Sequence, residues 1–596
     1  MHRRLKRAVA TAALRPGRAL RDALASGYGR RDLLADLQAG AIVGIVALPL
    51  SMALAIASGV PPQHGLQTAM VAGFVAALCG GSRVQVTGPT AAFVVILAPI
   101  AARHGVGGLL VATLLAGLIL VGMGAARLGR FIEFVPYPVT AGFTAGIAVV
   151  IGTLQLKDFL GLEVARMPEH YLDRIALLVK SLPTMHRADL LAGIGTIGIL
   201  LTWPKVTRRL PAPLLALTVV SLACRAAEQW IPGFHVATIA SRFPAAAAGL
   251  ADGIPRLPPI PSWPWSHPAG DGLPFHLKWE VIRTLAGPAF AIAMLGAIES
   301  LLSATVADGM TGDKHDSDAE LIGQGLANIV APFFGGIAAT GAIARTATNV
   351  RFGARSPLAA AFHAVFILAA VLVLAPALGH LPMAALAALL LVVAWNMGEF
   401  RHVAHVLRVA PRGDVLVLLT CFALTVLFDM VVAVSVGVVL AAFLFMERMA
   451  ESARADLLTE AHPDFLQGLP RNLVVYEVAG PLFFGAAQKA MSTLRTLRKN
   501  VKVVVFDLRA VPVMDATGLV NLESAIRRLH EAGIFVVLGG LNRRPRGVLE
   551  DAGWHDAPGR LALVDSFLEA VAIGRRRLEE VEGPTPVASQ GAPTSI

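Results

Sequence analysis

The sequence predicts a polytopic α-helical membrane protein that carries a soluble α/β domain at its C-terminal end. Of the 596 residues, 55% are hydrophobic and only 15% are charged, and the mean hydropathy of +0.66 lies outside the usual range of soluble proteins. Apolar runs close to the length that crosses a bilayer recur from about residue 36 to residue 450. The composition then becomes that of an ordinary soluble domain, so we expect two parts of different character.

Positive charge gathers near the N-terminus. The formal net charge is +11, and the first 35 residues contain Arg3, Arg4, Lys6, Arg7, Arg15, Arg18, Arg21, Arg30 and Arg31. Lys and Arg beside a first span hold that side in the cytoplasm, so residues 1–35 are predicted to be a basic cytoplasmic segment. No basic stripe interleaved with aromatic residues occurs, so we expect no binding to nucleic acid.

The sequence offers no pattern typical of a metal site, a cofactor site or an enzyme. Cys79, Cys224 and Cys421 stand far apart in apolar segments, with no CxxC pair and no histidine cluster beside them. No pairing of a nucleophile with a base is evident. We therefore expect no metal, no cofactor and no enzymatic activity.

Fourteen apolar segments form two groups of seven. The first group, within about residues 36–230, comprises 36–58, 63–80, 91–102, 109–128, 135–156, 190–203 and 214–227. After a connector rich in proline and tryptophan, the second group, within about 283–450, comprises 284–306, 321–334, a short segment around Arg345, 358–378, 383–395, 415–428 and 431–446. Since seven is odd, the groups would be inverted repeats of one transmembrane domain over 36–450. The even total places both termini in the cytoplasm.

The third segment of each group is too short to cross a bilayer alone. Each follows a pair of glycines and then a Thr-Gly dipeptide, Thr87-Gly88 in the first group and Thr340-Gly341 in the second. We expect half-helices preceded by irregular backbone, which a membrane tolerates only where it is buried or lines a cavity. Because a helix N-terminus carries the positive end of the dipole, paired half-helices predict a binding site for an anionic solute.

Two ionisable residues lie in the apolar segments near this predicted site. Arg345 stands among small residues, and an arginine at the bilayer centre costs roughly 2.5–3.5 kcal/mol on insertion scales, so it is expected to face a cavity. The alternative is an interfacial arginine that reaches lipid headgroups. Glu299 lies within the segment 284–306, and competition between substrate and Glu299 for Arg345 would couple binding to a proton. Its alternative is a static ion pair with Arg345 that joins two helices.

Three stretches resemble the SulP family of anion transporters. They are Gly80-Gly81-Ser82-Arg83 with Thr87-Gly88-Pro89-Thr90, Gly296-Ala297-Ile298-Glu299-Ser300-Leu301-Leu302-Ser303 with Ala307-Asp308, and Gly323-Gln324-Gly325-Leu326-Ala327-Asn328 leading to Arg345-Thr346. The resemblance covers about residues 30–570. It implies fourteen transmembrane segments in two inverted repeats, core and gate domains, a cytoplasmic STAS domain and a homodimer.

The same resemblance implies which residues bind the anion. In the family the anion lies between the N-termini of the third and tenth helices, and the matching positions here are Ala91, Ala92, Phe93, Ala344, Arg345 and Thr346. Backbone N–H groups would provide much of the binding. The lack of a Cβ at Gly88 and Gly341 would let the backbone approach the anion closely.

Further polar candidates are Gln38, Ser303 and Asn349. The amides of Gln38 and Asn349 could instead satisfy local backbone groups. Sodium-coupled relatives resemble the chain around Glu299 and Ser303 but lack an arginine where Arg345 stands. We therefore expect coupling to a proton and not to sodium.

The C-terminal part is predicted to be an α/β domain. Strands are expected at Leu473–Val478, Val501–Leu508 and Ile534–Leu538, with a helix at Thr517–Ala532. Val505-Phe506-Asp507-Leu508 and Met514-Asp515-Ala516-Thr517-Gly518-Leu519 resemble STAS domains, and the position of a phosphorylated serine in the bacterial relatives of that fold is Ala516. We expect no phosphorylation switch there, and Asp515 or Thr517 to cap the helix.

The predicted boundaries are a linker over 451–470, a STAS domain over 471–575 and a disordered tail over 576–596. Regulation, support of folding and a cytoplasmic partner all stay open for the STAS domain.

Together these observations predict a secondary active transporter of a small anion in the bacterial inner membrane. Sulfate is the first candidate, carried by proton-coupled symport and alternating access. Bicarbonate, a C4-dicarboxylate, or an anion channel or exchanger of the same architecture are the alternatives. A nucleobase transporter would require carboxylates or amides beside both half-helices in place of Arg345.

Overall fold

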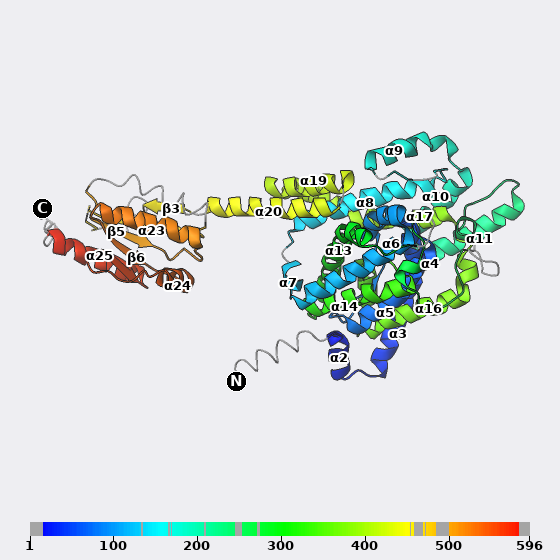
Figure 1. The fold of residues 1–596 in the computed structure, drawn as a ribbon, viewed down its shortest axis with the longest axis horizontal. Coiled ribbons are helices and arrows are strands. Elements are labelled where there is room, and N and C mark those ends of the chain that lie inside the picture. Colours follow the sequence, from blue (N-terminus) through cyan, green and yellow to red (C-terminus); the bar gives the residue numbers. More distant parts are fainter. Residues whose placement is uncertain are drawn as a thin grey trace, which may run out of the picture. The chain divides into compact units, whose positions relative to one another are not determined.

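The computed structural model describes residues 16–132, 135–164, 167–168, 170–207, 210–244, 253–270, 275–428, 430–452, 454–457, 469–470, 472–483 and 500–582. It divides into two compact units, Met1–Val439 and Leu440–Ile596. The first unit is a bundle of helices, and the second is built around a sheet (Figure 1).

The N-terminal half of the first unit contains long apolar helices joined by short ones. Its α-helices are α2 (Arg18–Ala25), α3 (Arg30–Ala57), α4 (Pro62–Gln67), α5 (Gly73–Cys79), α6 (Ala91–Ala125), α7 (Gly129–Ile132), α8 (Tyr137–Phe159), α9 (Tyr171–Lys180), α10 (Arg187–Val206), α11 (Ala212–Trp230) and α12 (Ile239–Arg242). A π-helical turn, η1 (Thr68–Ala72), links α4 to α5, and a 3₁₀ turn, η2 (Leu182–Thr184), follows α9. A two-residue strand, β1 (Thr87–Gly88), precedes α6.

The second half of the chain adds a comparable series. After the 3₁₀ turn η3 (Pro264–Ser266) come α13 (Trp279–Thr311), α14 (Ser317–Val330), the turn η4 (Ala331–Phe334), strand β2 (Thr340–Gly341), α15 (Ile343–Arg351), α16 (Leu358–Leu378), α17 (Met383–Gly398), α18 (Phe400–Val409), α19 (Arg412–Leu427) and α20 (Met430–Ser452). Each apolar segment predicted from the sequence overlaps one or more of these helices, and α16 has the predicted bounds.

Eight helical stretches in the described part of the chain are long and apolar enough to cross a membrane. They lie in α3, α6, α8, α10, α13, α16, α20 and the stretch Met383–Val409, which spans α17 and α18. The protein is therefore a multi-pass membrane protein, while the arrangement of fourteen spans in two inverted repeats stays a prediction.

Helix α6 joins two segments that the sequence analysis kept apart. The predicted segments 91–102 and 109–128 form one element that is broken at Gly105, where φ is 66° and ψ is −168°. A residue with a Cβ rarely adopts this conformation, so the break depends on glycine. The first part of α6 is consequently a half-helix of about the predicted length, and it continues directly into the next helix.

Helix packing brings the two halves of the chain together within the first unit. Helix α14 packs along α6, and α16 packs along α3. Asp36 of α3 is fully buried and accepts hydrogen bonds from the Tyr28 hydroxyl (2.8 Å), the Arg355 backbone (2.6 Å) and both the backbone and the hydroxyl of Ser356. Burial and the neighbouring Asp36 raise the pKa of Tyr28 to about 12, so this phenol keeps its proton and donates to Asp36.

The second unit contains a five-stranded sheet in the order β3-β4-β5-β6-β7. The strands are β3 (Arg454–Leu457), β4 (Leu473–Ala479), β5 (Val503–Asp507), β6 (Phe535–Gly539) and β7 (Leu561–Val564), and the described helices are α23 (Ala516–Glu531), α24 (Arg543–Asp551) and α25 (Phe567–Glu582). Only the β3–β4 pair is antiparallel; the other pairs are parallel, with Val475 opposite Val505 and Val505 opposite Val537.

The sheet of the second unit is covered on both faces. Phe506 packs with Leu522 of α23 on one face, and Val505 packs with Ala570 of α25 on the other. Alternate residues of a strand point to opposite faces, so a central strand covered on both sides must be apolar throughout. This explains the continuous apolar run from which β5 was predicted.

Several predicted boundaries differ from the structure. The sheet begins inside the predicted linker 451–470, because β3 pairs with β4, and residues 576–582 belong to α25 and not to the tail. Asp515 is the N-cap of α23, since its carboxylate accepts from the Gly518 backbone at 2.6 Å. Residues 1–15 of the predicted basic segment and 583–596 of the predicted tail lie outside the described residues.

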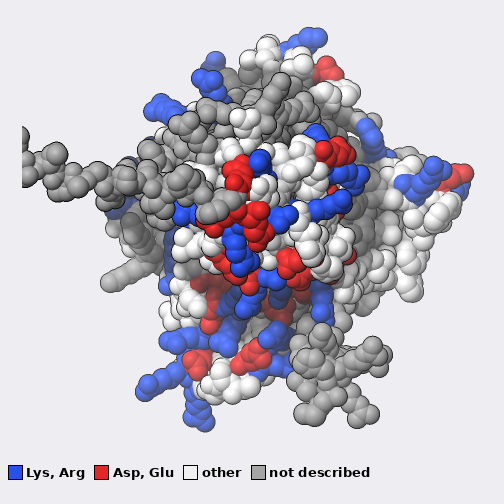
Figure 2. Space-filling model, turned by 90° about the vertical axis from the view of Figure 1, so that its left-hand side faces the viewer, with Lys and Arg blue, Asp and Glu red and all other residues white. Residues whose placement is uncertain are grey.

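Charged residues of both signs are interspersed on the described surface shown in Figure 2. The second unit contains ion pairs between charged side chains, including Arg546 with Glu550 and Arg577 with Glu580. Mixed charge of this kind is typical of a solvated surface.

Candidate functional site

The two Thr-Gly dipeptides meet in the structure. Strands β1 and β2 pair antiparallel, with Thr87 opposite Gly341 and Gly88 opposite Thr340. Helix α6 begins at Ala91, shortly after β1, and α15 begins at Ile343, shortly after β2. The Thr-Gly dipeptide that recurs in both halves of the sequence therefore lies where β1 and β2 pair. We call this pair of strands, flanked by the N-termini of α6 and α15, the crossing.

The first turns of both helices have backbone donors available. The N-cap residues, Thr90 for α6 and Ala342 for α15, provide no side-chain cap hydrogen bond. The first N–H groups of a helix have no partner within the helix, and they lie at the positive end of its dipole. This arrangement can bind an anion through the backbone.

Arg345 lies in the first turn of α15 and is only 3% exposed. Its Nη2 donates to the Pro89 carbonyl at 3.1 Å and to the Ser51 hydroxyl at 3.4 Å. Its Nε and Nη1 are buried and have no hydrogen-bond partner. Burial contradicts the alternative of an arginine that reaches lipid headgroups. A buried guanidinium with two unused donors is costly, and an anion would offset that cost.

Glu299 contacts the start of the other half-helix. Its Oε2 accepts a hydrogen bond from the Thr90 hydroxyl at 2.9 Å, and its side chain is partly buried. The described residues show no ion pair between Glu299 and Arg345: Glu299 accepts from Thr90, and Nη2 of Arg345 donates to Pro89 and Ser51. The alternative of a static ion pair is therefore not what this structure shows.

The other predicted residues have different surroundings. Ala91, Ala92 and Phe93 are buried at the start of α6, and a Cβ on Gly296 of α13 would lie 3.5 Å from the Phe93 ring, so this ring packs against α13. Ala344 is exposed at the start of α15. Gln38 is exposed on the outside of α3, because the buried positions Asp36, Ala39, Gly40 and Val43 define the opposite face.

Thr346, Ser303 and Asn349 connect the site to its supports. The Thr346 hydroxyl oxygen accepts from the Val86 backbone and from Ser303, both at 3.1 Å. Asn349 donates to the Val84 carbonyl at 2.8 Å. These three side chains fix α15 against the backbone that leads into β1.

Sequence reasoning missed Ser51 and Thr90 as members of the site. Ser51 is fully buried, two residues after Pro49 inside α3. A polar residue just after a proline in an apolar helix is a signal that could have revealed it. Thr90 follows the Thr87-Gly88-Pro89 turn, where a helix N-cap is expected.

A pocket of about 930 Å³ lies elsewhere in the first unit. Its lining includes Asp158, Asp189, Arg225 and Arg242 but neither Arg345 nor Glu299. Charges of both signs line it, so it offers no fixed positive centre. The crossing of β1 and β2 is the stronger candidate for an anion.

The site consists of half-helix N-termini beside a buried arginine, within a bundle of helices that are long enough to span a membrane. These features are typical of polytopic membrane transporters. The model of the sulfate permease family matches residues 33–421, and that of the STAS domain matches residues 466–564. The chain belongs to the sulfate permease family, SulP, with a C-terminal STAS domain, and it is not an enzyme.

Named relatives show the range of proteins to which the chain is similar. It is 40% identical over 528 residues to "Putative sulfate transporter YvdB" of Bacillus subtilis, covering 88% of this chain and 95% of the relative. It is 28% identical over 546 residues to the bicarbonate transporter BicA of Picosynechococcus, covering 86% and 90%. The solved structure of the murine anion transporter Slc26a9 in the inward-facing state shares the fold, with a TM-score of 0.78, 17% identity and 93% of each chain covered.

Gly88→Ala is expected to raise the KM for anion uptake on the order of a hundredfold, because small displacements of binding groups weaken a site steeply. A Cβ at this position would lie 2.4 Å from Nη1 of Arg345 and would displace the guanidinium. Gly287→Ala in α13 is the control, since nothing lies within 4 Å of its Cβ. An unchanged KM for Gly88→Ala, measured in proteoliposomes, would contradict the close approach of Gly88 to the site.

Proposed function

We propose that the chain is a secondary active transporter of a small oxyanion, with sulfate as the first candidate. The observation that carries this proposal is the pairing of β1 with β2, which puts Arg345 and two uncapped helix N-termini around one crossing. The relative named as a sulfate transporter, at 40% identity, supports sulfate as the substrate to test first. The anion binds between the first turns of α6 and α15, at Ala91, Ala92, Ala344 and Arg345.

Transport is coupled to a proton carried by Glu299. Glu299 is bound to Thr90, the N-cap residue of α6, so a change in its protonation acts on the half-helix that binds the anion. An isolated carboxylate within a membrane helix is typical of a proton relay. Alternating access between the two sides of the membrane completes the symport cycle.

The protein forms a homodimer in the bacterial inner membrane, with both termini in the cytoplasm. The basic residues near the N-terminus support this orientation. Two inverted repeats of seven segments account for the placement of β1 and β2 in corresponding parts of the two halves.

Bicarbonate is the second candidate substrate. The relative named as a bicarbonate transporter is similar to this chain over most of its length. Backbone donors and one guanidinium also suit a C4-dicarboxylate. A channel or an exchanger would use the same site but would not accumulate the anion in response to a proton gradient.

An uptake panel in proteoliposomes tests these proposals. Radiolabelled sulfate, bicarbonate and succinate are compared with and without an inward proton gradient, and with sodium present or absent. Saturable sulfate accumulation that requires the proton gradient and ignores sodium supports the proposal. Accumulation that requires sodium, or flux that only dissipates a gradient, would refute proton symport.

The STAS domain is proposed to support assembly and not to select the substrate. Deleting residues 454–596 removes the whole sheet from β3 onward and leaves α20 complete. We expect less active protein per cell but a KM within about threefold of the full chain, because the domain has its own core and none of the proposed anion-binding residues belongs to it. A changed order of preference among anions would contradict this assignment.

A further inference from the structure

Helix α14 carries three buried polar side chains on one face. Glu320, Gln324 and Asn328 follow one another at intervals of four residues and are 2%, 1% and 0% exposed. This spacing aligns side chains along a helix. Buried carboxylates and amides are costly unless they are hydrogen-bonded, so the partners of these three residues reveal what they do.

Glu320 binds the loop that leads into β1. Its Oε2 accepts from the backbone of Gly81 at 2.8 Å and of Ser82 at 3.1 Å. Its Oε1 accepts from the amide groups of Gln85 and Gln324, each at 2.9 Å. Because a carboxylate can only accept, both amides must turn their NH₂ groups toward it. Glu320 therefore fixes the orientation of Gln324.

Gln324 and Asn328 form hydrogen bonds with β1 and with the residue before β2. The Gln324 amide also donates to the Thr87 hydroxyl of β1 at 2.6 Å. Asn328 accepts from the Ala339 backbone N–H and donates to the Ala339 carbonyl, both at 2.8 Å. Ala339 immediately precedes β2, and Asn328 pairs with it much as a neighbouring strand would.

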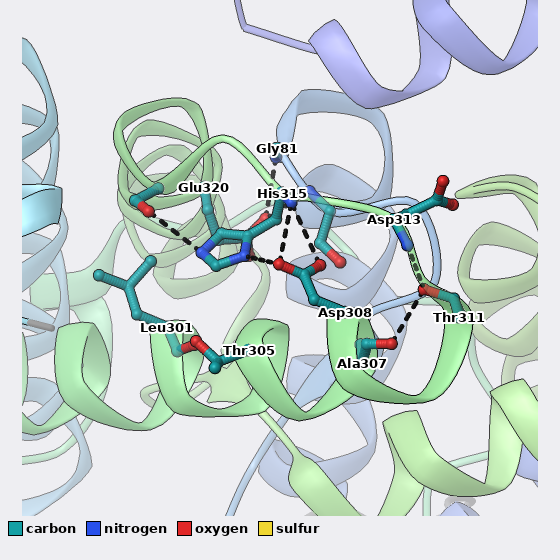
Figure 3. A network of polar contacts seen from close by, with 11 residues as sticks. Gly81, Leu301, Thr305, Ala307, Asp308, Thr311, Asp313, His315 and Glu320 are labelled. Carbon is teal, nitrogen blue, oxygen red and sulfur yellow. Dashed lines mark hydrogen bonds and ion pairs between the residues drawn. The ribbon is translucent and has the colours of Figure 1, made fainter.

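The N-terminal end of α14 is itself anchored to α13, the helix of Glu299. As Figure 3 shows, Asp308 near the end of α13 accepts from the His315 backbone at 3.1 Å and contacts the His315 ring at 2.7 Å. The same view places Gly81 and Glu320 beside this connection. The Asp316 side chain caps α14 by accepting from the Ala319 backbone at 3.1 Å. Glu320 thus projects from a fixed first turn.

We propose that Glu320, Gln324 and Asn328, the α14 ladder, are positioning residues for the anion. They hold β1 and β2 in register and so set the spacing between the N-termini of α6 and α15. The α14 ladder acts through Thr87 and Ala339 and does not touch the anion. Its effect on transport rests on the proposed function.

The shortness of the strands makes the α14 ladder necessary. β1 and β2 contain two residues each, so their own pairing fixes their position poorly. Hydrogen bonds from helix N–H groups to an anion weaken steeply with distance and angle. Removing the hydrogen bonds of one residue of the α14 ladder should therefore weaken anion binding more than it destabilises the helical bundle.

Gln324→Met tests this inference, because methionine has a similar volume but no amide. We expect the KM for sulfate to rise on the order of tenfold, since the Thr87 hydroxyl and Glu320 each lose a buried partner. Leu326→Met is the control on the same helix, because Leu326 is partly buried and outside the α14 ladder. Thr87→Val removes the other end of the same bond, and the double variant should cost no more than the costlier single variant.

Hydrogen exchange of the full-length protein without any anion provides a readout independent of transport. In Gln324→Met, peptides that cover 84–93 and 338–346 should exchange faster than in the wild type or in Leu326→Met. Faster exchange supports the α14 ladder even if the wild type failed to carry sulfate, in which case only the proposed substrate would fall. Unchanged exchange in Gln324→Met, or less folded protein with an unchanged KM, would overturn the inference.

Discussion

Replacing Arg345 by alanine is expected to abolish high-affinity anion uptake. The guanidinium is buried, it holds Pro89 and Ser51, and its Nε and Nη1 have no other partner. Truncating one member of a buried, charge-assisted contact costs about 3 kcal/mol, which corresponds to a rise in KM on the order of a hundredfold. The measurement is the concentration dependence of sulfate uptake in proteoliposomes.

Arg351→Ala is the matched control for that variant. Arg351 is the last residue of the same helix, it is exposed, and its loss changes the net charge equally. We expect its KM to stay close to that of the wild type. Arg345→Lys should recover part of the affinity, because it restores the charge but not the planar guanidinium. If Arg345→Ala took up sulfate with the wild-type KM, Arg345 would not be part of the anion site.

Glu299→Gln should carry the anion without coupling to protons. Glutamine has nearly the same shape and can still accept the hydrogen bond from Thr90 through its carbonyl oxygen, but it cannot gain or lose a proton. Accumulation driven by an inward proton gradient is expected to disappear, while exchange of internal for external sulfate continues. The two assays on the same proteoliposomes separate loss of coupling from loss of binding.

Glu280→Gln is the control for the coupling variant, since Glu280 is an exposed residue in the first turn of the same helix. Gradient-driven accumulation should survive this change. If Glu299→Gln still accumulated sulfate in response to the gradient, the proton would have to travel by another residue. Loss of exchange as well would make Glu299 part of anion binding instead.

The apolar pattern predicted where helices form because hydrophobic length and composition largely decide that. Helix α16 has its predicted bounds, and the predicted break before Ala91 is where α6 begins. The pattern did not show that α6 continues past Gly105, because a single glycine conformation decides it. Strand β3 escaped prediction since a four-residue edge strand has almost no periodic signal.

Within the site, the sequence predicted the elements better than the contacts. The Thr-Gly dipeptides pointed to matching half-helices, and the structure pairs them directly. That Thr90 bonds to Glu299 and that Ser51 bonds to Arg345 depends on how distant helices pack. The sequence pattern did not indicate that Gln38 is exposed, because its orientation on α3 depends on which face of the helix packs inward.

The pairing of Thr87 with Gly341 also dictates when the protein becomes competent during its synthesis. A nascent chain that ends before Thr340 has inserted the first half-helix but has nothing to complete the crossing. Thr87 and Gly88 have no strand to pair with until the complementary stretch leaves the ribosome. Under the proposed function, prematurely terminated chains would therefore be unable to bind the anion, however many helices they had inserted.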